Sequence, residues 1–155
     1  MEISVTWYKP LNLEEEETND NSIYSIAIDQ LPDEAGCYIF YREFGKSKTI
    51  IYIGRAQNIK ARIKSQLNHL RLMKGIQNSG KGSKLLMFCT LNIKRGQNLV
   101  RVLGLLEKNL IKEAFAQGYE LLNIQGSKIH FHRIVFSGNR TSEYFFNRSI
   151  LSPDK

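Results

Sequence analysis

Glu107 combines a reactive carboxylate with a position that charged side chains normally avoid. Residues 98–117 are expected to form a helix that begins at Asn98, because asparagine is a favoured helix N-cap. A burial cost of several kcal/mol means that a carboxylate on an apolar helix face needs a metal cation, a basic partner or a raised pKa. A metal ligand and a salt bridge to Arg62 or another basic side chain are both consistent with the sequence. On a projection at about 100° per residue, the apolar residues around Glu107 are Val100, Leu103, Leu110, Ile111 and Ala114.

Two tyrosines lie in short runs that are typical of β-strands. Tyr38 opens the run 38–40, and Tyr52 lies in the run 49–53. Residues 45–48 between them contain a glycine and have the length of a hairpin turn, so both tyrosines are expected in one small sheet. Tyrosines in strands are otherwise usually half-buried packing residues. On the residues alone, this alternative stays open.

A helix is expected directly after the second of these strands. Arg55 and Asn58 follow Gly54, and Arg62 lies beside the apolar stripe of the helix. This order places two arginines close behind the tyrosines. The residues that form the stripe are Ile59, Ile63, Leu67 and Leu70.

The tripeptides Gly36-Cys37-Tyr38 and Tyr52-Ile53-Gly54, followed by Arg62 on a helix, resemble the GIY-YIG nuclease superfamily, whose members cut DNA with a divalent metal. Leu31-Pro32 and the segment 107–112 also resemble the nuclease domain of the excision-repair incision proteins. Each tripeptide alone is a weak signal, but their order and their strand-turn-strand-helix context make a specific combination. The resemblance covers residues 31–123.

The resemblance implies a role for each of these side chains. Glu107 is implied to hold one divalent ion, Mg²⁺ or Mn²⁺, at the scissile phosphate. Tyr38 is implied to be the general base or water-orienting group, with Tyr52 beside the phosphate, and Arg62 is implied to bind the phosphate as charge develops. Arg55 stands where relatives often carry lysine. Because the reference pKa of a phenol is near 10, either a neighbouring cation lowers the pKa of Tyr38 or its proton is relayed onward, and Arg55 and Arg62 are the expected cations.

Three further residues are candidates with open alternatives. Many relatives carry a histidine or tyrosine one helical turn after the catalytic arginine, and this chain has Gln66, which cannot transfer a proton at neutral pH. His69, a further turn along, is a candidate replacement in catalysis. Asn123 resembles a late asparagine of the family that bridges strand backbone and active site, although asparagine also commonly caps turns.

The chain of 155 residues has a formal net charge of +7, which favours a polyanionic partner. DNA is the expected partner, with RNA as the second candidate and an ordinary solvated basic surface as the alternative. The segment 75–84 is rich in glycine and lysine, and a flexible linker is an equal alternative there. The lysines expected to contact nucleic acid are Lys60, Lys64, Lys74, Lys81 and Lys84.

The sequence favours an intracellular, cytoplasmic protein. No apolar run approaches the length of a transmembrane span, and the N-terminus lacks the basic-then-apolar order of a secretory signal. Cys37 and Cys89 lie in apolar strand-like runs and are expected to be buried thiols.

We predict a single mixed α/β (α+β) domain over residues 1–155, with a small, mainly antiparallel sheet flanked by helices. The predicted nuclease core is 31–123, preceded by an N-terminal strand and a solvated acidic loop in 1–30. A β-extension in 124–155 is expected to add strands that pair with the N-terminal run.

The predicted function is metal-dependent endonucleolytic hydrolysis of DNA. The competing interpretations are a nucleic-acid-binding module that is weak or inactive in catalysis, and a nuclease subunit that cuts only when a protein partner delivers the substrate.

Overall fold

The computed structural model describes residues 1–16, 23–123, 131–135, 137–138, 141, 145 and 149–153. Most of the predicted extension in 124–155 and the end of the acidic loop lie outside the described residues. Among the described residues, none of the helices combines the length and the apolar character needed to cross a bilayer.

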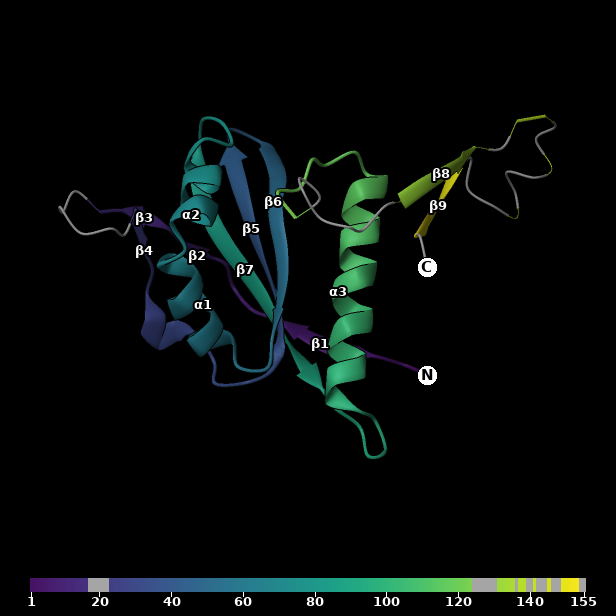
Figure 1. Cartoon of the computed structure of the whole chain (residues 1–155), viewed down its shortest axis with the longest axis horizontal. Coiled ribbons are helices and arrows are strands. Elements are labelled where there is room, and N and C mark those ends of the chain that lie inside the picture. The colour runs from purple at the N-terminus through teal and green to yellow at the C-terminus, as the bar shows by residue number, and fades with distance from the viewer. Residues whose placement is uncertain are drawn as a thin grey trace.

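The centre of the fold is an antiparallel sheet with the strand order β1-β7-β5-β6 (Figure 1). The long strands β5 (Gly36–Phe44), β6 (Ser47–Ala56) and β7 (Ser83–Asn92) form its body. The short strands β1 (Ser4–Trp7) and β2 (Leu11–Asn12) both pair with β7, which leaves β6 as the opposite edge strand. The predicted mixed α/β class with a mainly antiparallel sheet is confirmed.

Strands β5 and β6 form the predicted hairpin, with a tighter turn than expected. Only Gly45 and Lys46 lie between the paired residues Phe44 and Ser47, because Gly45 adopts a φ of 59° that suits a two-residue turn. The register places Tyr38 opposite Gly54. The two halves of the sequence motif are therefore direct neighbours across the sheet.

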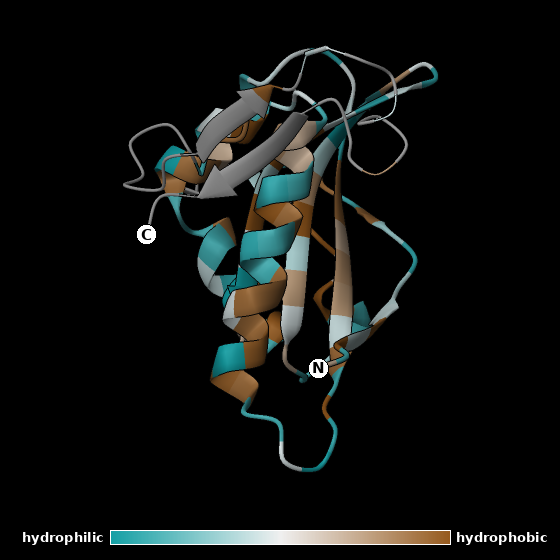
Figure 2. Ribbon diagram, turned by 90° about the vertical axis from the view of Figure 1, so that its right-hand side faces the viewer, coloured by the Kyte–Doolittle hydropathy of each residue, from teal (hydrophilic) through white to brown (hydrophobic). Residues whose placement is uncertain are grey.

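Helices cover the sheet on both faces. Helices α1 (Ile59–Leu67) and α2 (Leu70–Gln77) pack on one face, and α3 (Leu99–Ala116) lies along β6 and packs on the other (Figure 1). In Figure 2, α3 alternates between hydrophobic and hydrophilic residues, as expected of a helix with one buried side. The buried residues on the α1–α2 face include Tyr38, Phe40, Ile59, Ile63, Met73 and Phe88. Those on the α3 face include Ile39, Tyr41, Ile53, Ile111 and Ala114.

The prediction of one continuous helix through Leu70 is wrong. Helix α1 ends at Leu67, and α2 begins at Leu70 with His69 as its N-cap. The Nδ1 atom of His69 accepts a hydrogen bond from the Leu72 backbone N–H at 3.1 Å. The apolar stripe continues across the break, which is why the sequence pattern alone does not reveal it.

Residues that follow α3 satisfy the free edge of β6. The Leu122 N–H donates to the Ile51 carbonyl at 2.8 Å. Asn123 completes this edge: its Oδ1 accepts from the Ile53 N–H at 2.9 Å and its Nδ2 donates to the Ile53 carbonyl. The side-chain amide thus replaces a neighbouring strand at that position, as the predicted bridge to strand backbone required.

Two small hairpins complete the described structure. Strand β3 (Glu14–Glu15) pairs with β4 (Tyr24–Ser25), so part of the predicted acidic loop is a strand. In the described part of the C-terminal region, β8 (Phe131–Val135) pairs with β9 (Ser149–Pro153). The predicted pairing of C-terminal strands with the N-terminal run is wrong for these strands, because β8 and β9 form a two-stranded sheet of their own.

Replacement of Asn123 by alanine should lower the free energy of unfolding by about 1–3 kcal/mol, because the Ile53 N–H and carbonyl lose their partner. Urea unfolding measures this loss. Asn109→Ala is the matched control, since that exposed amide donates only to the Leu105 carbonyl of its own helix, and it should change stability by less than about 0.5 kcal/mol. Equal losses in the two variants would contradict a role for Asn123 in closing the sheet edge.

Candidate active site

Glu107 and Arg55 meet on the α3 side of the edge strand. The Arg55 Nε atom lies 3.9 Å from Glu107 Oε1, and the Glu107 side chain is 25% exposed. This separation exceeds the roughly 2.7–2.9 Å of a charge-assisted hydrogen bond, so the pair is loose. Burial raises the pKa of Glu107, while Arg55 and then Arg62 lower it without cancelling the rise. Of the two arginines considered from sequence, Arg55 is the one in ion-pair range.

Tyr38 and Tyr52 lie on the other face of the same hairpin, under α1. Their rings are stacked with centroids 6.2 Å apart. The Tyr38 side chain is buried, at 1% exposure, and its hydroxyl accepts a hydrogen bond from Gln66 Nε2 at 2.9 Å. The Tyr38 and Tyr52 phenols also affect each other's pKa. Gln66, Tyr38 and Tyr52 therefore form a row of neighbouring polar groups.

The expected lowering of the Tyr38 pKa is wrong in direction. Burial raises the pKa of Tyr38, and the adjacent Tyr52 phenol raises it further. Gln66 and Arg62 act in the opposite direction but do not outweigh burial. Burial, followed by the charge of Glu107, also raises the pKa of Tyr52. Both phenols are therefore neutral near pH 7.

Two motif glycines make this packing sterically feasible. A Cβ atom on Gly54 would lie 2.3 Å from Cζ of Tyr38, so the tyrosine ring fits only over a residue without a side chain. A Cβ atom on Gly36 would lie 1.7 Å from the Cys89 carbonyl oxygen of β7. The glycines of both tripeptides thus permit close approach within the sheet.

Arg62 links the two faces of the site. It is exposed on α1, and its charge acts on Tyr38, Tyr52 and Glu107. Because β6 is the edge strand among the described parts of the sheet, side chains from opposite faces approach one another around its edge. The structure therefore brings together five of the predicted residues, Tyr38, Tyr52, Arg55, Arg62 and Glu107.

A groove of about 650 Å³ adjoins this cluster between α1, α2 and the segment after α3. The lining includes Tyr52 and Arg62 from the predicted site, but not Tyr38. Tyr52 is consequently the tyrosine that reaches the open side of the site. The other lining residues are Ser65, Gln66, His69, Arg71, Leu72, Gly75 and Leu122.

Gln66 and His69 make different contacts in the structure, and the sequence did not reveal this difference. Gln66 contacts Tyr38 directly, whereas His69 uses Nδ1 to cap α2 and lines the groove beyond it. Sequence reasoning also missed Arg71, because the helix break that turns it toward the groove was not recognised. The available signal for Gln66 was its position one helical turn after Arg62.

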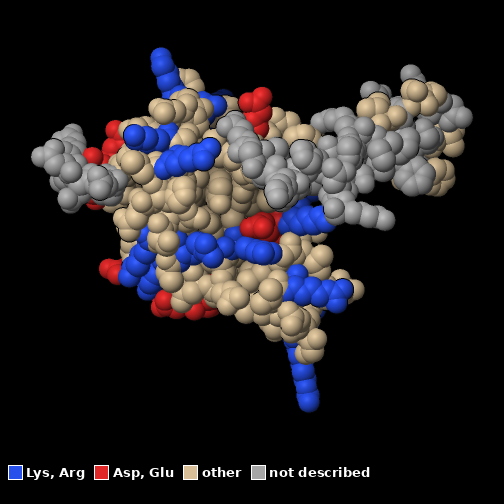
Figure 3. Space-filling view, viewed as in Figure 1, with Lys and Arg blue, Asp and Glu red and all other residues tan. Residues whose placement is uncertain are grey.

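Basic side chains form a band across the middle of the face shown in Figure 3, from the α1 side toward α3. Lys64, Lys74 and Lys81 are exposed, as a phosphate contact would require, and Lys60 lies 3.5 Å from Asp33 in an ion pair. Lys84 differs from the prediction. It is 7% exposed and its Nζ donates to the Gly80 carbonyl, so it holds the loop before β7 and is not open to a phosphate.

The donor set at Glu107 fits a hard divalent cation. A half-buried carboxylate with one loose cationic neighbour retains oxygen lone pairs for a metal, and Mg²⁺ commonly uses one or two carboxylates plus water. Among the described residues, no group of three or more histidine, cysteine, aspartate or glutamate side chains could enclose a metal. The residues around Glu107 therefore fit a metal ion that keeps most of its water ligands.

Alanine at Gly54 should destabilise the protein strongly, because its Cβ would displace the buried Tyr38 ring and break the contact with Gln66. Gly104→Ala is the comparison. Its Cβ would meet only the flexible end of Arg55, at 2.7 Å from Nη1, and alanine favours a helix over glycine by about 1 kcal/mol. Thermal unfolding should show a lower midpoint for Gly54→Ala and an equal or higher one for Gly104→Ala. A harmless Gly54→Ala would contradict the packing described.

Proteins named UvrABC system protein C from three organisms are similar to this chain. The chain is 34% identical to the protein of Mycoplasma mycoides subsp. mycoides over 96 residues. These residues make up 62% of this chain and 15% of the relative. The chain is 31% identical over 96 residues to the protein of the same name from Mesoplasma florum. The protein of that name from Methanococcus maripaludis is 44% identical over 43 residues, or 28% of this chain.

No protein-family model matches the chain, and no solved structure is found to match it. The chain spans about 15% of the length of the first two relatives. Over 62% of its length, the chain is therefore similar to a short part of the proteins named UvrABC system protein C.

Proposed function

We propose that this chain is a metal-dependent endonuclease that hydrolyses DNA phosphodiester bonds through a GIY-YIG active site. The observation that carries the proposal is the convergence of Glu107, Arg55, Arg62 and the Tyr38–Tyr52 pair around the edge of β6. The similarity to the proteins named UvrABC system protein C supports it, alongside the resemblance of the motifs to the nuclease domain of excision-repair incision proteins.

Glu107 is the proposed ligand of Mg²⁺ or Mn²⁺. A cation held there would supply positive charge at the scissile phosphate and the departing oxygen. Arg55 lies close enough to orient the carboxylate, and its loose contact leaves room for the cation. The raised pKa of Glu107 reflects the cost of burying its charge, a cost that a bound cation would reduce.

Tyr52 is proposed to orient the attacking water, with Tyr38 as its support. Tyr52 reaches the groove and therefore faces the substrate, while buried Tyr38 stands behind it. Gln66 donates to the Tyr38 oxygen, so the Tyr38 O–H is left to donate toward Tyr52. In this arrangement Tyr38 acts as a positioning residue for Tyr52.

Arg62 is proposed to bind the phosphate during the reaction. It is exposed, it lines the groove, and its charge acts on both tyrosines and on Glu107. A guanidinium can donate two parallel hydrogen bonds to phosphate oxygens, and these strengthen as negative charge develops on them.

A second candidate function is a nuclease subunit that cuts only when a protein partner delivers the DNA. The relatives are named as protein C of the UvrABC system, and the chain spans only a small part of their length. The described residues provide a basic face and a reaction site, and neither of these explains how a particular site on DNA is selected.

Glu107→Gln should abolish Mg²⁺-dependent cleavage while DNA binding stays nearly unchanged, because the amide is isosteric but cannot ligate the metal with a negative charge. Supercoiled plasmid, linear duplex, single-stranded DNA and RNA, each with Mg²⁺ or chelator, are the substrates. Glu113→Gln on the exposed side of the same helix is the control and should cut like wild type. Cleavage by Glu107→Gln in Mg²⁺ would sink the assignment of the ligand.

The same assay separates the competing functions. Binding without cleavage by the wild type would support an inactive module or a partner-dependent subunit. Cleavage that is metal-dependent and absent from Glu107→Gln would support a self-sufficient nuclease and would identify its substrate class.

Arg62→Ala should reduce the single-turnover cleavage rate by about 10²-fold or more and weaken binding far less, because its contact is strongest in the transition state. Lys64→Ala removes an exposed charge from the same helix and should reduce the rate by less than about tenfold. If Arg62→Ala lowered rate and affinity equally, Arg62 would be a simple phosphate anchor.

A further inference from the structure

The groove beside the site has the composition of an anion site with an apolar floor. It is lined by the cationic side chains Arg62 and Arg71 and by His69, and the described residues in its lining include no carboxylate. Leu72 and Leu122 supply apolar surface. Gly75 lets the floor close, because a Cβ atom there would lie 2.8 Å from Cδ1 of Leu122.

His69 faces the groove with a fixed tautomer. Its Nδ1 atom accepts the Leu72 N–H, so in the neutral ring the proton resides on Nε2. The capping contact also fixes the ring orientation, and exposure of the residue leaves Nε2–H available as a donor. His69 therefore fits the role of a hydrogen-bond donor to a ligand better than that of a proton relay to Tyr38, whose hydroxyl is already taken by Gln66.

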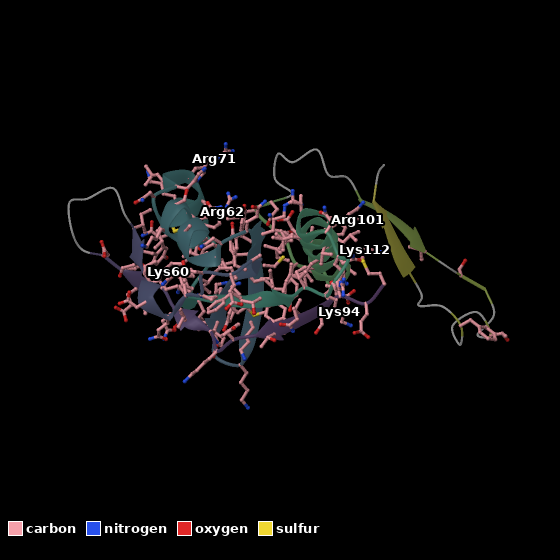
Figure 4. The ribbon with its side chains drawn as sticks, turned by 90° about the horizontal axis from the view of Figure 1, so that it is seen from below. Lys60, Arg62, Arg71, Lys94, Arg101 and Lys112 are labelled. Carbon is pink, nitrogen blue, oxygen red and sulfur yellow. The ribbon has the colours of Figure 1, made fainter. Side chains whose placement is uncertain are left out.

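Arg71 is the second cation of the groove. It is exposed in the first turn of α2, and it takes part in none of the ion pairs between described residues. In Figure 4, Arg62 and Arg71 lie on the α1–α2 side of the molecule, apart from Arg101 and Lys112 on α3. The two guanidinium groups thus serve one groove from consecutive helices.

We infer that this groove binds the phosphate next along the strand from the phosphate that is cut, with Arg71 and the Nε2–H of His69 as its donors. The inference rests on the proposed function, which places Arg62 at the scissile phosphate. Successive phosphates of a nucleic acid need successive cations, and the sugar between them is the part of the chain that tolerates an apolar surface. Arg62, Arg71 and the leucine floor provide these features within one groove.

Binding without metal tests the subsite independently of catalysis. In chelator, the affinity for a labelled duplex and for the corresponding single strand is measured against salt concentration. Arg71→Ala should weaken binding about tenfold and reduce the slope of log affinity against log salt by about 0.9 for duplex or 0.7 for single strand, the value for one phosphate. His69→Asn keeps a residue that caps helices and should weaken binding a few-fold without a change in the thermal midpoint.

Arg101→Ala is the matched control, because it removes the same kind of side chain from an exposed position on α3 that does not line the groove. It should leave the salt slope within about a third of a phosphate equivalent. An equal effect of Arg71→Ala and Arg101→Ala would overturn the subsite, since a general surface charge would then explain both.

Kinetics place the bound phosphate relative to the cut. Arg71→Ala should raise KM about tenfold with kcat unchanged, because the phosphate that it binds does not react. A fall in kcat with unchanged KM would overturn the assignment to a neighbouring phosphate. If the chain binds DNA with the expected salt slopes but does not cut it, the subsite stands and the nuclease proposal fails. If the chain cuts DNA but Arg71→Ala and Arg101→Ala behave alike, the nuclease proposal stands and the subsite fails.

Discussion

The structure of the site depends on one constraint, the position of β6 at the edge of the sheet. Inside a sheet, the residues of opposite faces are separated by neighbouring strands. At the β6 edge, Arg55 on one face and Tyr52 on the other both come under the influence of Glu107. An open edge is also a liability, because its backbone groups lack partners. Leu122 and Asn123 satisfy three of these groups, at Ile51 and Ile53, and α3, which carries Glu107, is tied to β6 by the segment that follows it.

The tyrosine pair illustrates how packing and reactivity oppose each other. Gly54 leaves room for the Tyr38 ring over β6. This placement buries the phenol and raises the pKa of Tyr38. A buried neutral phenol is a poor base but a well-defined hydrogen-bond partner. Gln66 suits this state, since an amide can hold a hydroxyl in place without exchanging a proton with it. The Gln66 amide therefore sets the direction of hydrogen bonding at Tyr38, and reactivity is left to the tyrosine that reaches the groove.

The sequence predicted the parts of the fold that depend on local pattern. The hairpin with Tyr38 and Tyr52, and α3 with Glu107 on its apolar side, follow from strand and helix periodicity. What the pattern could not provide is the order of strands. The residues next to β1 and β7 in the sequence do not reveal that these two strands pair. The burial of Lys84 under the loop before β7 depends on that tertiary arrangement. A lysine in a glycine-rich segment looks exposed until the loop that covers it is known.

The break between α1 and α2 is the clearest case of a feature that the sequence conceals. Apolar residues recur at helical spacing through Leu67 and Leu70, so periodicity favours one helix, while the capping bond of His69 to Leu72 starts a second one. In one continuous straight helix, Arg71 would lie farther along the helix axis from Arg62. The restart at Leu70 instead returns Arg71 and His69 to the side of Arg62, and the groove exists because the two helices meet there. Nδ1 of His69 thus caps α2, and only Nε2 remains available to a ligand.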